Sequence, residues 1–85
     1  MEYVIVAFRS RAQTVRFSEF LRSNGVANEI VNTPKEAGVG CGLSVKISKG
    51  SFSLAKKAVK ILSLSSFAGF FLVAIIGGKR IVRTI

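Results

Sequence analysis

Hydrophobic and polar positions change their spacing several times along the chain, and each spacing predicts a different element. Residues 2–8 form a β-branched and aromatic run that is apolar on both faces, which is typical of a central strand covered on both sides. Residues 11–24 then follow a helical period, with Ser10 as a candidate N-cap and Asn24-Gly25 as the C-terminal stop. The side of this helix that we expect to be buried carries Thr14, Phe17, Phe20 and Leu21.

The middle of the chain predicts two further strands with a glycine-rich loop between them. Residues 26–32 have a weaker strand pattern, which Pro34 ends because proline fixes φ and lacks an amide donor. Apolar and polar residues alternate over positions 43–48, which predicts a half-exposed strand. Its inward residues would be Leu43, Val45 and Ile47, and its outward residues Ser44, Lys46 and Ser48.

A second amphipathic helix and an apolar hairpin follow. Ser51 or Ser53 can cap the helix. Its apolar positions at i, i+3, i+4 and i+7 are Ala55, Ala58, Val59 and Leu62, and its outer face carries Lys56, Lys57 and Lys60. The apolar run 67–76 predicts a strand, Gly77-Gly78 a two-residue turn, and residues 79–85 a returning strand.

The element order is therefore β-α-β-β-α-β with an extra C-terminal strand, in a single domain over residues 1–85. This order predicts an α+β fold, a ferredoxin-like two-layer sandwich with two helices on one face of an antiparallel sheet. The fourth strand is apolar on both faces, and a bare apolar edge invites association. We expect the terminal hairpin, a second copy of the chain in a homodimer, or both to cover it.

The same apolar segment allows an alternative in which the protein is a membrane-associated adaptor. Residues 61–78 carry no charge over 18 positions, which meets the length criterion for a membrane-spanning helix. Three serines and three glycines weaken the hydrophobicity of this segment. A helix here, in place of a strand, would favour the membrane alternative.

Composition narrows the classes of partner and of chemistry. The 85 residues carry 13 basic and 4 acidic side chains, a net charge of +9, which favours acidic partners or simply keeps a small apolar protein in solution. Nucleic-acid binding on a sheet of this kind needs exposed aromatic side chains for stacking. The third strand offers none facing outward, and only Tyr3, Phe8 and Phe71 could reach an open face, so this class is disfavoured.

The chain has no histidine and no carboxylates at a metal-ligand spacing, which argues against metal sites, cofactors and triad chemistry. A single cysteine, Cys41, excludes an internal disulfide and fits a cytoplasmic location. Any chemistry therefore depends on Cys41. Its loop contains Gly38, Gly40, Gly42 and Lys35, and a thiol in an accessible, electropositive loop is a usable nucleophile.

We hypothesise that Cys41 is the reactive residue, that Lys35 helps to lower its pKa, and that backbone amides near Gly40 and Gly42 stabilise the thiolate. Two alternatives stay open. The cysteine could be an inert residue in a turn before a strand, and the three glycines could cradle a phosphate, although the Lys-Ser/Thr of a P-loop is missing.

The loop also carries a family resemblance, in Thr33-Pro34-Lys35 and in Cys41-Gly42-Leu43-Ser44-Val45. With this element order, the chain resembles the Se/S carrier protein-like family. The resemblance implies that Cys41 carries sulfur or selenium as a persulfide-type adduct between donor and acceptor proteins, as a carrier more than a true catalyst, with Thr33 and Pro34 shaping the loop. Lys35 stands where the family usually has arginine, and lysine lacks the bidentate fork of a guanidinium group.

Overall fold

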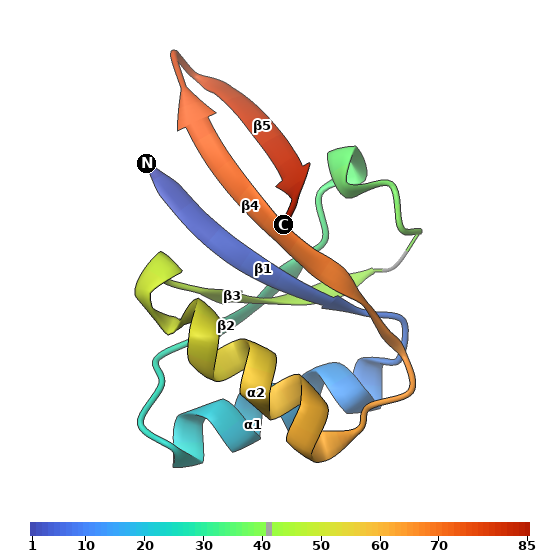
Figure 1. The fold of residues 1–85 in the computed structure, drawn as a ribbon. Helices are drawn as coiled ribbons and strands as arrows, with labels where there is room; N and C mark the ends of the chain where they lie inside the picture. The colour runs from blue at the N-terminus through green and yellow to red at the C-terminus, as the bar shows by residue number, and fades with distance from the viewer. Residues whose placement is uncertain (41) are drawn as a thin grey trace.

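Helices and sheet form separate layers in the computed structural model, which describes residues 1–40 and 42–85 (Figure 1). Within these residues two helices lie on one face of a five-stranded antiparallel sheet. The predicted α+β class with an antiparallel sheet is confirmed. In chain order the elements are β1 (Glu2–Phe8), α1 (Arg11–Ser23), β2 (Glu29–Asn32), the 3₁₀ turn η1 (Lys35–Ala37), β3 (Leu43–Ile47), the 3₁₀ turn η2 (Lys49–Ser51), α2 (Phe52–Leu62), β4 (Phe67–Ile76) and β5 (Lys79–Thr84).

The strand order in the sheet is β2-β3-β1-β4-β5. Each helix connects two strands that have a third strand between them: α1 joins β1 to β2 across β3, and α2 joins β3 to β4 across β1. The central position predicted for residues 2–8 is confirmed, because β1 pairs with both β3 and β4 and Val4 to Phe8 are at most 2% exposed.

The core between the helices and the sheet forms as the helical period predicted. Val4, Val6 and Phe8 of β1 point to this side, and the Phe8 and Phe17 rings lie 5.0 Å apart between centroids. The predicted N-cap of α1 is also present, since the Ser10 hydroxyl accepts a hydrogen bond from the Gln13 amide at 3.2 Å. The helices contribute Phe17, Leu21, Ala55 and Ala58 as fully buried residues.

The start of the second strand and the capping of α2 differ from the sequence prediction. The second strand begins at Glu29 rather than at residue 26, because Val26 donates its amide to the Leu21 carbonyl at 2.9 Å and is buried in the helical core. These first residues therefore belong to the turn that closes α1. Capping of α2 by a serine side chain is wrong for the described residues: the Ser51 hydroxyl pairs with the Ser48 hydroxyl at 3.2 Å, and Ser53 lies inside the first turn.

The apolar segment 67–76 is a strand, and it returns through the predicted turn at Gly77-Gly78. β5 pairs with β4 from Phe71↔Thr84 to Ile76↔Lys79, so the hairpin covers the apolar edge as expected. No helix among residues 1–40 and 42–85 is long and apolar enough to cross a membrane. Residues 61–78 therefore lack the helix that the membrane alternative requires.

Candidate functional site

The loop between β2 and β3 folds over the face of the sheet opposite the helices. Ala37 and Val39 pack there against a second, smaller core, whose fully buried members are Ile5, Ala7, Phe71 and Val73. Val82 of β5 packs against the same cluster, and η1 contacts β5 (Figure 1). The loop that was expected to carry the chemistry is thus also the cover of this core.

Covering the sheet in this way reverses one sequence prediction. Ser44 was expected to point outward from a half-exposed strand, but it is fully buried. Its hydroxyl forms a hydrogen bond of 2.7 Å with the Thr33 hydroxyl, and the Thr33 amide donates to the Gly42 carbonyl at 3.1 Å. The alternation of apolar and polar residues wrongly predicted that Ser44 is exposed, because the loop after β2, and not solvent, lies over this side of β3. These contacts close the base of the loop.

The backbone of the loop makes two tight changes of direction. Pro34 is buried, and its carbonyl accepts the Ala37 amide at 3.1 Å to form η1. Gly38 ends this turn with φ of 67°, and Gly40 has the same φ of 67°. A residue with a Cβ atom is disfavoured in this left-handed region, so both positions select glycine.

The predicted site residues fall at different places in this loop. Cys41, the predicted nucleophile, lies outside the described residues. Gly40 and Gly42 on either side of it are exposed, and a Cβ atom at either would meet nothing within 4 Å. Lys35 is exposed on η1, and Thr33 and Pro34 lie at the base of the loop. The structure thus joins Thr33 to Gly42 directly, while Lys35 lies one turn further along.

A cavity of about 220 Å³ adjoins Gly42. It is lined by Phe8, Arg9, Arg11, Gly42 and Leu43. Phe8 and Leu43 are register partners in the sheet, and this pairing places the β1–α1 connection beside the start of β3. The two arginines were not among the predicted site residues, because only the β1–β3 pairing brings them to the loop. The available signal was a pair of basic residues flanking an N-cap serine directly after a central strand.

An ion pair fastens the loop to β5. The Arg80 guanidinium donates two hydrogen bonds to the Glu36 carboxylate, at 3.1 Å from Nε and 3.0 Å from Nη2. The hydrogen bond from Arg80 lowers the pKa of Glu36 below its ordinary value, and the same contact raises that of Arg80. No spacing in the sequence indicated this pair, since it depends on the register of β5.

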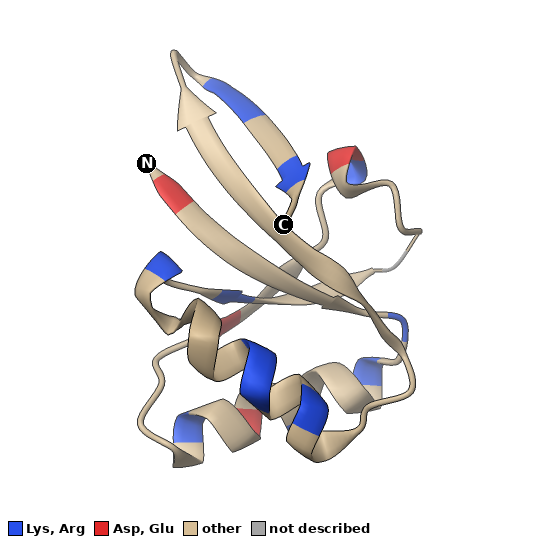
Figure 2. Cartoon of the chain, in the orientation of Figure 1, with Lys and Arg blue, Asp and Glu red and all other residues tan. Residues whose placement is uncertain are grey.

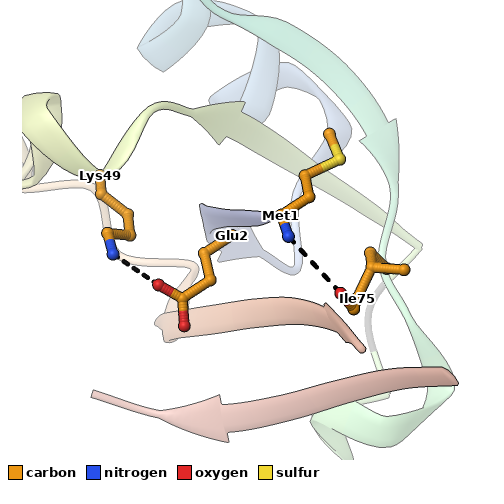
Figure 3. A network of polar contacts seen from close by, with 4 residues as sticks. All are labelled: Met1, Glu2, Lys49 and Ile75. Atoms are coloured by element: carbon orange, nitrogen blue, oxygen red, sulfur yellow. Dashed lines mark hydrogen bonds and ion pairs between the residues drawn. The ribbon is translucent and has the colours of Figure 1, made fainter. Parts of the chain in front are cut away.

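Two of the other carboxylates, Glu2 and Glu29, form ion pairs with lysines, and neither lines the arginine-lined cavity. Figure 2 shows the acidic positions in red and the basic positions in blue. Glu29 lies 3.7 Å from Lys46, and Glu2 pairs with Lys49 at the start of β1. Figure 3 shows this pair beside the Met1 amino group, which donates to the Ile75 carbonyl at 3.5 Å. The Lys49 hydrogen bond lowers the pKa of Glu2. The contacts of Met1 and Glu2 hold the end of β1 opposite to Arg9.

In the part of the chain that the structure describes, the three aromatic candidates for base stacking are buried or half-buried. Phe8 and Phe71, which were expected to reach an open face in a nucleic-acid-binding protein, are 1% and 3% exposed. Tyr3 is half-buried, with the Lys46 ammonium 4.4 Å from its ring centroid. The candidates for base stacking are therefore occupied in packing, which removes the main support for that class of function.

Comparison with protein families decides the relationship that the loop suggested. The family described as "Putative Se/S carrier protein-like" matches residues 2–62, which is 61 of the 85 residues. The chain belongs to this family. The matched region of this Se/S carrier-like protein runs from β1 to α2. It contains the whole loop between β2 and β3 and the residues that line the arginine-lined cavity, whereas β4 and β5 lie beyond it. No curated protein and no solved structure matches the chain.

Proposed function

We propose that this protein is a sulfur or selenium carrier in which Cys41 bears the transferred atom. The observation that carries the proposal is the family match, which spans Cys41 and its loop. The exposure of Gly40 and Gly42 supports it, because a carrier must present its thiol to two different proteins in turn. The partners proposed are a donor protein and an acceptor protein in the cytoplasm.

The proposed transfer consists of two exchanges at one sulfur atom. The Cys41 thiolate attacks the terminal sulfur of a donor persulfide, and the donor leaves as its own thiolate. A nucleophile of the acceptor then attacks the terminal sulfur on Cys41 and restores the thiolate. Lys35 and the backbone amides around Gly40 and Gly42 are proposed to stabilise the negative charge. The protein returns to its starting state only through the acceptor, so it acts as a carrier.

We also propose that the fold is a ferredoxin-like sandwich extended by β5. The support is the pair of interleaved β-α-β units, in which each connecting helix crosses over one intervening strand. Association of two copies stays a prediction. β5 now occupies the edge in question and carries Lys79, Arg80 and Arg83, so like charges would lie near one another in an edge-to-edge pair.

Mass spectrometry of the protein after incubation with a persulfide donor tests the carrier proposal. The wild-type chain is expected to gain the mass of one sulfur atom, which a thiol reductant removes, and Cys41→Ser is expected to gain nothing. Lys35→Gln should reduce the loading rate, whereas Lys57→Gln on the outer face of α2 removes the same charge and should leave the rate unchanged. Equal loading of the wild type and Cys41→Ser would rule out the proposal.

The pH dependence of thiol alkylation gives an independent measurement. A reactive carrier cysteine should show an apparent pKa well below the value of about 8.5 for free cysteine. A thiol that reacts only after unfolding would return Cys41 to the alternative of an inert residue in a turn.

A further inference from the structure

The arginine-lined cavity beside Gly42 has the composition of an anion site. Arg9 follows β1 and Arg11 begins α1, so the two arginines flank the N-cap Ser10 in the sequence; both are exposed and line the cavity. Gly42 contributes no side chain, Leu43 is half-buried, and the Phe8 ring is buried in the helical core. The positive end of a 13-residue helix lies at the same place. Guanidinium groups and a helix N-terminus together favour a negatively charged ligand.

The two arginines are available to such a ligand. Arg80 is held by Glu36, but neither Arg9 nor Arg11 forms an ion pair with any residue in the ranges 1–40 and 42–85. No carboxylate lines the cavity within the same ranges. In Figure 2 the connection between β1 and α1 is basic and carries no acidic segment. The positive charge here is therefore not neutralised by the protein itself.

The size of the cavity limits the ligand. Its volume of about 220 Å³ exceeds the space of a few water molecules but lies below the range of roughly 300–1,000 Å³ that is typical of sites for drug-sized ligands. A small tetrahedral oxyanion fits this description better than a nucleotide. A planar guanidinium fork can bind two oxygens of such an anion at once.

We infer that Arg9 and Arg11 bind, beside Gly42, the oxyanion end of a small thiosulfonate-type sulfur donor, of which thiosulfate is the simplest. This inference rests on the proposed function of Cys41. In the step, the Cys41 thiolate attacks the outer sulfur of thiosulfate, a new S–S bond forms, and the old S–S bond breaks with its electron pair on the leaving sulfite. One thiolate and one thiosulfate dianion give one persulfide anion and one sulfite dianion, so atoms and charge balance without an oxidant or reductant.

Anion binding is measured first on Cys41→Ser, which cannot react. Titration with sulfate and with thiosulfate, followed by amide NMR, should shift the signals of Arg9, Arg11 and Gly42. Arg9→Gln or Arg11→Gln should weaken binding by about three- to fivefold each, as expected for removing a unit charge about 5 Å from a dianion in water at physiological ionic strength. Lys57→Gln on α2 is the matched control, with the same loss of charge. Equal weakening by the control, or shifts confined to other residues, would overturn the inference.

A second experiment measures the local field at the thiol in the wild-type chain. Iodoacetate is an anion and iodoacetamide is neutral, and both alkylate the same sulfur. A change in the pKa of the thiol alters both rates, so their ratio reports only the attraction of the negative reagent. We expect Arg9→Gln and Arg11→Gln to lower the iodoacetate-to-iodoacetamide ratio about threefold each, and Lys57→Gln to leave it unchanged. A ratio that is the same in all variants would contradict the site.

The two proposals fail separately in these measurements. If sulfate binds through the arginines but no donor loads sulfur onto Cys41, the carrier function and the transfer step are wrong and the anion site stands. If a persulfide donor loads Cys41 but the arginine variants bind sulfate as the wild type does, only the anion site is wrong. If both hold, Arg9→Gln should slow loading from thiosulfate while Arg9→Lys restores part of the rate.

Discussion

The two faces of the sheet share their strands but are covered in different ways. On one face α1 and α2 bury large side chains such as Phe8, Phe17 and Leu21. On the other face the loop after β2 and the β5 strand cover a smaller cluster around Ile5, Phe71 and Val73. The helical cover consists of repeated backbone hydrogen bonds and packing. The loop cover depends on a few specific contacts, and it is the side that carries the candidate chemistry. We expect the first face to control stability and the second to control the site.

The largest effect should come from the helical face. Phe17 is fully buried against Phe8, and Phe17→Ala should cost about 3–5 kcal/mol, which is a large part of the stability of a domain of this size. Urea unfolding measures this loss. Phe17→Leu keeps the variant folded and should cost less. A small loss for Phe17→Ala would show that the helical core is not the main source of stability.

On the loop face, the hydrogen bond between Thr33 and Ser44 should have the next largest effect. Thr33→Val leaves the buried Ser44 hydroxyl without this partner and should cost about 1–3 kcal/mol. Ser44→Ala removes the buried hydroxyl itself and should cost less. The double variant should therefore recover part of the loss relative to Thr33→Val, and a double-mutant cycle in urea measures the coupling. Strict additivity would contradict a direct contact.

Substitution of the two left-handed glycines should have a smaller effect. Gly38→Ala and Gly40→Ala each place a Cβ atom at φ of 67° and should cost about 1–2 kcal/mol. Gly50→Ala is the matched control, since its Cβ atom would also meet open space and its φ lies outside this region. Thermal unfolding compares the three variants. An equal cost at Gly50 would show that backbone strain is not the cause.

The Glu36–Arg80 pair should give the smallest effect, visible mainly in its pH dependence. Because the pKa of Glu36 is lowered in the folded chain, its contribution to stability is present above the ordinary value of 4.5 and is lost as the pH falls through the lower folded value. Glu36→Gln should therefore destabilise slightly near neutral pH and have no effect in acid. Hydrogen exchange should quicken at Ala37 to Val39 in this variant but not in Glu2→Gln, whose ion pair lies elsewhere.

Features that depend on residues close together in the sequence could be predicted, whereas features that depend on long-range contacts could not. The Ser10 cap, the buried stripe of α1 and the turn at Gly77-Gly78 depend on residues a few positions apart, and all are confirmed. The burial of Ser44 was not predicted, because it depends on the path of a loop that begins eleven residues earlier, at Thr33.

The same limit applies to the site. Lys35 was predicted to stabilise the thiolate because it is near Cys41 in the sequence. The arginines beside Gly42 lie about thirty residues earlier in the chain, and only the pairing of β1 with β3 brings them to the loop. Glu36 and Arg80 are 44 positions apart and gave no local signal. The assignment of Cys41 itself stays a prediction.

The place of β1 at the centre of the sheet has a consequence for how the chain reaches its native state. β1 precedes both of its partners, and Glu2 pairs with Ala74 near the opposite end of the sequence. The central pairing must therefore close a very long segment, a topology associated with slow folding. Until β4 arrives, one edge of the apolar β1 strand is unpaired, so β1, β2 and β3 can pair first but the sheet is completed only after residues 67–76 have been synthesised.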